Sequence, residues 1–306
     1  MNNIKQDKAH SEIPPVGLPD IMEIVDVSHI KNKYLDIQYT GTSEQQKLDI
    51  YLPDAGDGPF PLIIHIHGGG FCLGDKRDGH IISYLEVLNR GYALASVNYR
   101  LAPNSPFPDA VYDCKAAIRF LRANSQKYNI DPMRFGVIGG SAGGNLAAMI
   151  ALTAKVNWFD KEAVEYKDVS CAVQACVDWF GPTDFLLMDT HAKENGFGIT
   201  DHCEADSPES KYMGGALTSL DPEWVSKANP ITYINEEIPP MLIQHGRKDK
   251  LVPFQQSEIF VNAIEEKLGK NRVLFIPLDD AEHDDPLFTS EQNLEIVWGF
   301  FDKYLK

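Results

Sequence analysis

Positive charge is scarce in this sequence. It has 28 Lys and Arg residues against 44 Asp and Glu residues, which gives a formal net charge of -16. Proteins bind nucleic acids and anionic membranes through clusters of Lys and Arg. We therefore expect no nucleic acid and no membrane as a partner, and acidity alone indicates nothing about a substrate.

Long apolar runs are also missing. No stretch approaches the roughly 18 apolar residues that a membrane helix needs. The first residues, MNNIKQDKAHSEIPP, lack the apolar core of a signal peptide. These two absences predict a cytoplasmic protein.

Cysteine is too sparse to build a scaffold. An odd number of cysteines without C-x-x-C spacing argues against both a disulfide framework and a zinc site. We expect buried free thiols at Cys72, Cys114, Cys171, Cys176 and Cys203. The sequence also has no phosphate-binding loop and no dinucleotide fingerprint, so we expect no metal and no cofactor.

What the sequence does contain is a regular alternation of strand and helix patterns. Apolar or alternating runs predict strands over 21–27, 33–40, 47–53, 61–67, 92–99, 134–140, 169–180, 239–246 and 271–278. Helical spacing predicts helices over 80–90, 108–121, 142–154, 255–267 and 291–304. We expect the first strands to be antiparallel at a sheet edge. The prediction is an α/β fold with a doubly wound, mostly parallel sheet.

One stretch interrupts the alternation. Residues 184–238 consist of short polar pieces rich in Gly, Pro, Asp and aromatic residues, and they are too many for an ordinary connection. We interpret this stretch as a cap insertion over an active site. The expected organisation is a flexible segment over 1–20 and a single domain over 21–306.

The segment Gly139-Gly140-Ser141-Ala142-Gly143 matches the motif G-x-S-x-G. It lies between a predicted strand and an alanine-rich predicted helix, which is the context that a nucleophile elbow requires. Glycines flank such a serine because the strained turn leaves no room for side chains. The motif predicts Ser141 as a nucleophile.

A second glycine-rich turn, His67-Gly68-Gly69-Gly70, follows the predicted strand over 61–67. A serine that attacks a carbonyl carbon needs hydrogen-bond donors for the oxygen that becomes negative. We expect the backbone N–H groups of Gly69, Gly70 and Ala142 to form this oxyanion hole. Alone, the turn could simply end a strand; beside the nucleophile motif it favours catalysis.

A nucleophilic serine also needs a base and an acid. His283 follows the strand over 271–278, where a side chain reaches back over the carboxyl edge of a sheet. Asp249 follows the strand over 239–246 and is expected to orient the imidazole. The order Ser141, Asp249, His283 is that of α/β hydrolases. The alternative acids near His283 are Asp279, Asp280, Asp284 and Asp285, which we interpret as a solvated loop.

These motifs resemble those of the α/β-hydrolase carboxylesterases related to hormone-sensitive lipase and to bacterial acetyl xylan and feruloyl esterases. The resemblance extends from about residue 35 to the end and rests on HGGGF (67–71), NYRLAPNSPFPDA (98–110), GGSAGGNLAA (139–148), DWFGPTDF (178–185), HGRKDKLVP (245–253) and the AEH ending at His283. Gly140 and the KDKLVP segment are closer to the xylan-associated esterases. The resemblance implies a serine esterase for short acyl esters, acetylated or feruloylated carbohydrates among them.

Two other functions use the same fold. An amidase or peptidase, such as an arylformamidase, shares the machinery and differs in its pocket. The second alternative is a homologue that has lost catalysis and only binds ligands. The presence of Ser141, Asp249 and His283 together disfavours it. The motifs do not specify the oligomeric state.

Other residues near the motifs have less specific signals. We expect Tyr99 and Arg100 to hold the oxyanion strand in place, and His65 to be a core residue. Candidate substrate-binding residues, for which packing is the common alternative, are Phe71, Trp179, Phe180 and Met188, with Phe197, Met213 and Trp224 in or near the cap.

Overall fold

A computed structural model of the chain describes residues 23–160 and 165–306. The expected flexible segment over 1–20 lies outside the described residues. The described residues contain an eight-stranded sheet in the order β1-β2-β4-β3-β5-β6-β7-β8. Its strands are β1 (Lys33–Gln38), β2 (Lys47–Tyr51), β3 (Phe60–Ile66), β4 (Ala93–Val97), β5 (Ile130–Gly140), β6 (Ala175–Trp179), β7 (Met241–Gly246) and β8 (Val273–Leu278).

The strand directions place the candidate residues at one edge. β1 pairs antiparallel with β2, and β2 pairs antiparallel with β4. All other neighbouring strands are parallel. The carboxyl ends of β3, β5, β7 and β8 therefore meet at one edge, and each is followed by one of the segments singled out in the sequence. The predicted sheet, with its antiparallel edge, is confirmed.

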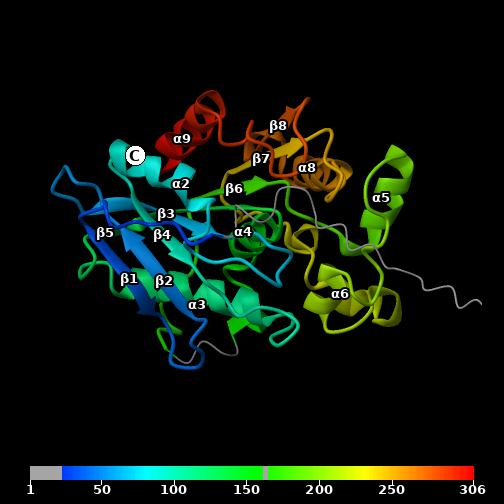
Figure 1. Cartoon of the computed structure of the whole chain (residues 1–306), viewed down its shortest axis with the longest axis horizontal. Coiled ribbons are helices and arrows are strands. Elements are labelled where there is room, and N and C mark those ends of the chain that lie inside the picture. The colour runs from blue at the N-terminus through cyan, green and yellow to red at the C-terminus, as the bar shows by residue number, and fades with distance from the viewer. Residues whose placement is uncertain (1–22, 161–164) are drawn as a thin grey trace, which may run out of the picture.

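Helices cover both faces of the sheet (Figure 1). Side chains of β3 alternate between the two cores: Leu62 and Ile64 belong to one, and Ile63 belongs to the other. The first core is covered by α3 (Asp109–Ala123), α4 (Ala142–Thr153) and α8 (Gln255–Leu268). The second is covered by α2 (Ile81–Tyr84), the 3₁₀ helix η1 (Leu85–Arg90) and α9 (Glu291–Leu305).

The stretch between β6 and β7 folds into short helices. They are η3 (Phe185–Leu187), α5 (Met188–Asn195), α6 (Pro208–Met213), η4 (Leu217–Ser219), α7 (Pro222–Ser226) and η5 (Pro230–Tyr233). In Figure 1, α5 and α6 lie at the side of the molecule away from β1 and β2. The remaining short helices are η2 (Asn157–Asp160) and η6 (Lys270–Arg272).

One predicted strand is wrong where the structure describes it. Residues 23–27 form no strand, although their pattern alternates. Val27 is buried and Ile24 is 59% exposed, so the alternation reflects packing of one side against the core. The backbone N–H of Val25 donates to the carbonyl of Arg77, in a loop and not in a strand. The predicted strand over 169–180 is also shorter, because β6 begins at Ala175.

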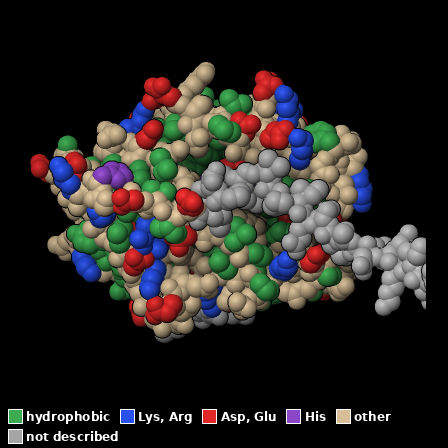
Figure 2. All heavy atoms as spheres, viewed as in Figure 1, with side chains coloured by type: hydrophobic (Ala, Val, Ile, Leu, Met, Phe, Trp, Pro, Cys, Tyr) green, Lys and Arg blue, Asp and Glu red, His purple; other side chains and the backbone are tan. Residues whose placement is uncertain are grey.

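The surface carries both charge signs. On the face shown in Figure 2, basic and acidic side chains are interspersed, and neither sign forms a continuous patch. Among the described residues, no helix combines the length and the apolar character needed to cross a bilayer.

Candidate active site

Ser141 occupies a strained turn between β5 and α4. Its backbone has φ 55° and ψ -124°, a conformation that residues other than glycine rarely adopt and that costs of order 1–3 kcal/mol. The turn is held by the Ser141 N–H, which donates to the carbonyl of Trp179 over 2.9 Å, and by the Ser141 carbonyl, which accepts from Asn145. The sharp strand-to-helix turn expected from G-x-S-x-G is present.

Close backbone approach explains the glycine that follows in this motif. A Cβ atom added to Gly143 would lie 2.1 Å from the carbonyl oxygen of Ile66 and 2.8 Å from that of His67. Both are backbone atoms at the point where β3 runs into the oxyanion turn, so neither can rotate away. α4 thus packs directly against the end of β3.

The structure brings Ser141, His283 and Asp249 together from three loops. The Oγ of Ser141 lies 3.0 Å from Nε2 of His283, and Nδ1 of His283 lies 2.7 Å from Oδ2 of Asp249. An ionised carboxylate only accepts hydrogen bonds, so Nδ1 is the donor and Nε2 remains free to accept from the serine hydroxyl. The Asp249 side chain is fully buried, and that of His283 is 13% exposed.

The two buried groups stabilise each other's charge. Burial by itself raises the pKa of Asp249, but the charge and hydrogen bond of His283 and a hydrogen bond from His245 outweigh it and hold that pKa well below its usual range. Burial likewise lowers the pKa of His283, and the Asp249 carboxylate outweighs this and raises it above its ordinary value. An imidazolium is therefore favoured when His283 accepts a proton.

Further donors fix the Asp249 carboxylate. Its Oδ1 accepts from the backbone N–H groups of Leu251 and Val252, each over 2.8 Å. Its Oδ2 also lies 3.2 Å from Nε2 of the buried His245, whose Nδ1 is 2.7 Å from the Ser257 hydroxyl. Sequence reasoning gave His245 no role, although its place four residues before Asp249 was a usable signal.

The oxyanion turn depends on glycine. Gly69 has φ 102°, and a Cβ on it would lie 2.3 Å from the carbonyl oxygen of Leu73. Within the described part of the chain, none of the backbone N–H groups of Gly69, Gly70 and Ala142 donates a backbone hydrogen bond. The three N–H groups are therefore not engaged by the backbone, as an oxyanion hole would require.

The Tyr99 side chain supports this turn. The Tyr99 hydroxyl donates to the carbonyl of His67 over 3.0 Å, and the two rings stack with centroids 4.4 Å apart. Arg100 bonds Asp113 of α3 through its guanidinium and its backbone N–H. The expected role of Tyr99 is confirmed, and Arg100 joins the same loop to α3. His65 is also a core residue: burial lowers its pKa to about 3, and its Nδ1 lies 2.9 Å from Oγ of Ser96.

Three exposed ion pairs join the loop after β7 to the loop after β8. We call them the ion-pair ladder: Arg247 with Asp279, Lys248 with Asp280 and Lys250 with Glu282. The N–O distances are 2.9, 2.7 and 2.7 Å. The first loop carries Asp249 and the second carries His283. Asp279 and Asp280 are solvated, as the sequence indicated, and they are paired in register with the basic loop. Asp284 departs from the prediction, because it is only 32% exposed and bonds His80.

The segment between β6 and β7 touches both sides of the site. The Tyr212 ring of α6 stacks on Phe71 with centroids 3.9 Å apart, and Pro208 packs against Gly70. At the other side, the N–H of Ile199 donates to the carbonyl of Lys250 over 2.8 Å. The insertion therefore contacts the oxyanion turn and the loop that carries Asp249.

The predicted substrate-binding residues are packed rather than open. Exposed fractions are 2% for Phe71, Trp179 and Phe180 and zero for Met188. The Trp179 indole donates to Gln244, and the Phe180 ring meets the His283 ring edge-on with centroids 4.7 Å apart. These side chains support the site and offer a substrate almost no surface. Of the other candidates, Met213 is buried, Trp224 is partly buried and Phe197 is 41% exposed.

Two exposed apolar side chains that the sequence did not single out lie in the segments that flank the site, one beside the oxyanion turn and one in the loop of Asp249. Leu73 is 41% exposed, and its side chain approaches the position of a Cβ on Gly69. Leu251 is 38% exposed, two residues after Asp249. No sequence pattern distinguishes these leucines from core leucines, because exposure depends on the packing of remote segments.

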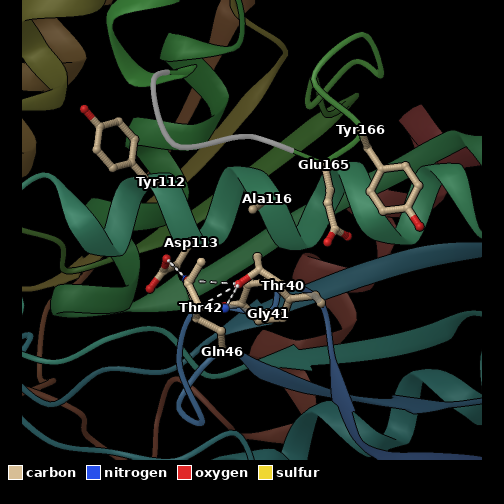
Figure 3. Close-up of a pocket in the computed structure, with 10 residues that line it drawn as sticks. Thr40, Gly41, Thr42, Gln46, Tyr112, Asp113, Ala116, Glu165 and Tyr166 are labelled. Carbon is tan, nitrogen blue, oxygen red and sulfur yellow. Dashed lines mark hydrogen bonds between the residues drawn. The ribbon is translucent and has the colours of Figure 1, made fainter.

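A separate surface pocket lies between α3 and the loop that joins β1 to β2 (Figure 3). Its polar side chains bond to one another: Thr40 Oγ1 and Gln46 Oε1 are 2.6 Å apart, Thr42 also bonds Gln46, and Gln46 Nε2 donates to Asp113 over 2.6 Å. Tyr112 and Tyr166 lie at opposite ends of the view. None of the triad or oxyanion residues lines it.

The strand order and the elbow define the class of the protein, an α/β hydrolase. The model of the BD-FAE family matches residues 48–264, which is more than half of the sequence. The chain belongs to the BD-FAE family.

Individual relatives are esterases by name. The probable carboxylic ester hydrolase LipM of Mycobacterium tuberculosis is 30% identical over 252 residues, which are 81% of this chain and 55% of LipM. The chain spans about half the length of the curated relatives it matches.

Solved structures give the same picture. A bifunctional GH43-CE protein of Bacteroides eggerthii is 31% identical with a TM-score of 0.79, and the match covers 90% of this chain and 35% of that one. A truncated carbohydrate esterase from gut microbiota is 28% identical with a TM-score of 0.82, over 92% of this chain and 99% of that one.

Proposed function

We propose that this chain is a serine carboxylesterase that hydrolyses short acyl esters by a triad of Ser141, His283 and Asp249. The observation that carries the proposal is the continuous hydrogen-bonded series from Ser141 Oγ through His283 to the buried Asp249 carboxylate. It begins at a serine whose strained backbone projects from the end of β5, as a nucleophile requires.

The chemistry follows from the proton positions. His283 Nε2 takes the proton of Ser141 as Oγ bonds the carbonyl carbon of the ester, and the imidazolium is stabilised by Asp249. The same proton passes to the leaving alcohol as the C–O bond breaks. A water molecule then gives one proton to His283 as its oxygen attacks the acyl carbon. The bond from that carbon to Ser141 Oγ breaks, the acid leaves, and His283 returns the proton to Oγ. No cofactor enters these steps.

The oxyanion of each tetrahedral intermediate is assigned to the amides of Gly69, Gly70 and Ala142. Backbone donors that are already in place cost no reorganisation during the reaction, and one such donor contributes about 10²- to 10³-fold in rate. The support of the turn by Tyr99 and by Pro208 of α6 keeps these donors in place.

For the substrate we propose esters of carbohydrates, with acetyl and feruloyl groups as the acyl candidates. Two observations support this choice: a carbohydrate esterase is similar over nearly its whole length, and a protein with a CE unit is similar over 90% of this chain. The segment between β6 and β7 acts as the cap that shapes the acyl and alcohol sites, with Leu73 and Leu251 at its border.

Replacing Ser141 with Ala tests the mechanism. We expect kcat for p-nitrophenyl acetate to fall by at least about 10³-fold, with an unchanged melting temperature and no labelling by a fluorophosphonate probe. Wild-type rates in the Ser141→Ala variant would disprove the mechanism. Acetylated xylo-oligosaccharides, methyl ferulate and matched amides, assayed side by side with the wild-type chain, test the substrate class; faster cleavage of the amides would replace the esterase by an amidase.

A further inference from the structure

A second histidine lies beside the loop that carries His283 and takes no part in the acyl transfer above. The ring of His80 sits between two carboxylates: Nδ1 is 3.0 Å from Oδ1 of Asp78, and Nε2 is 2.9 Å from Oδ2 of Asp284. Ionised carboxylates only accept hydrogen bonds, so the ring donates from both nitrogens and carries a positive charge. Burial by itself lowers the pKa of His80, but the hydrogen bonds and charges of Asp284 and Asp78 outweigh it and raise this pKa to about 10.

The two carboxylates belong to different loops. Asp78 lies in the loop of His80 itself, is almost fully buried, and also accepts the backbone N–H of His80 over 3.1 Å. It therefore fixes His80 from its own side. Asp284 is 204 residues away along the chain and directly follows His283. The His80 ring thus joins the loop after the oxyanion turn to the loop after β8.

Asp284 also has an unusual backbone. Its φ is 54°, in the left-handed region that favours glycine, so the chain turns sharply immediately after His283. The hydrogen bond to His80 restrains the side chain of this residue. His283 is then held at two points: its ring bonds Asp249, and the next residue bonds His80.

We propose that His80 is a positioning residue: clamped by Asp78, it holds Asp284 and so fixes the loop that presents the His283 ring to Ser141. This inference rests on the proposed role of His283 as the general base. The pair of His80 and Asp284 thus positions the pair of His283 and Asp249.

We call His80 and Asp284 the clamp. Their charges also act on His283 itself. The titratable groups that interact electrostatically with His80 are Asp78, Asp284, His65, His67 and His283. Asp284 raises the pKa of His283, whereas His80 lowers it. The two members of the clamp therefore act on the base with opposite signs, and removing either one shifts the titration of His283 in a known direction.

The test uses His80→Gln and Asp284→Asn in the full chain, assayed with p-nitrophenyl acetate over roughly pH 5 to 9. We expect His80→Gln to lower kcat about tenfold and to change KM by no more than about twofold. The variant misplaces the His283 ring but leaves substrate binding unaffected. Loss of the His80 charge raises the pKa of His283, so the acidic limb of the pH–activity profile moves to higher pH. Loss of the Asp284 charge moves it to lower pH.

Two controls separate positioning from folding. Asn tolerates the left-handed backbone and keeps an acceptor oxygen, so Asp284→Asn should retain more kcat than Asp284→Ala. His29→Gln makes the same change at an exposed histidine and should leave kcat and the limb unchanged.

Unchanged kcat and an unmoved limb in both clamp variants would overturn the inference. A loss of kcat without opposite displacements of the acidic limb would overturn it as well, because Asp284 and His80 shift the titration of His283 in opposite directions when they lie beside it. Failure of the proposed function is distinguishable, since it would appear as full activity in Ser141→Ala regardless of His80.

Discussion

The two halves of the candidate site are held in place by different forces. The nucleophile half comprises residues 67–71 and 139–143, and the base half comprises residues 247–252 and 279–285. In the nucleophile half, backbone meets backbone: a Cβ on Gly143 would lie 2.1 Å from Ile66 O, and one on Gly69 would lie 2.3 Å from Leu73 O. Its geometry depends on the absence of side chains.

The base half is built from charged side chains. His283 bonds Asp249, Asp284 bonds His80, and the ion-pair ladder joins the two loops at the surface. This difference predicts that adding side-chain atoms should disrupt the nucleophile half. Removing a charge or changing the pH should act on the base half. The predictions below test this contrast.

The largest expected effect on activity is in the buried part of the base half. Asp249→Asn should lower kcat by about 10³- to 10⁴-fold, because the amide no longer fixes the Nδ1–H tautomer of His283 or stabilises its charged form. Steady-state kinetics with p-nitrophenyl acetate measure it. A loss below about tenfold would show that another carboxylate serves His283, and Asp279→Asn, at an exposed carboxylate in the loop that carries His283, is the control.

The largest expected effect on stability is in the nucleophile half. Gly143→Ala should destabilise the fold by about 3 kcal/mol or more and lower kcat about 10²-fold, because the new methyl group meets two backbone carbonyls that cannot move aside. Denaturant unfolding measures the first effect. The same substitution at Gly299, where a Cβ meets nothing within 4 Å in α9, should instead stabilise by about 0.5–1 kcal/mol. Equal effects at both glycines would contradict steric control.

The pH dependence of kcat/KM should follow the titration of His283 in the base half. His283 acts as a base only when neutral, and the Asp249 carboxylate raises its pKa above 6.5 despite burial. The acidic limb of kcat/KM should therefore have its midpoint above pH 6.5, with activity falling about tenfold per unit below it. A profile measured at constant ionic strength checks this. A midpoint well below 6.5 would show that burial, and not Asp249, dominates at His283.

The smallest effect should come from the ion-pair ladder. Its members are exposed, and water and salt screen such pairs. Arg247→Ala or Lys248→Ala should each change the melting temperature by at most about 2 °C, and the difference should vanish in about 1 M NaCl. Thermal scans at low and high salt measure it. A larger shift that survives high salt would mean that the ladder acts by packing.

The local patterns of the sequence were sufficient to predict the sheet, its antiparallel edge and the order of Ser141, Asp249 and His283. Each depends on neighbours in the chain: strand periodicity, glycines beside a serine, and a side chain following a strand. Parallel strands then bring such segments to one edge whatever their separation in sequence.

Only the tertiary structure decided which side chains surround the site. His80 and Asp284 are 204 residues apart, and nothing in GDKRDGH or HDD indicates that they meet. Burial of Phe71, Trp179, Phe180 and Met188, and exposure of Leu73 and Leu251, likewise depend on which segments pack over them. The physical reason is that motifs encode the backbone geometry of single turns, whereas contacts between loops follow from the packing of the whole chain.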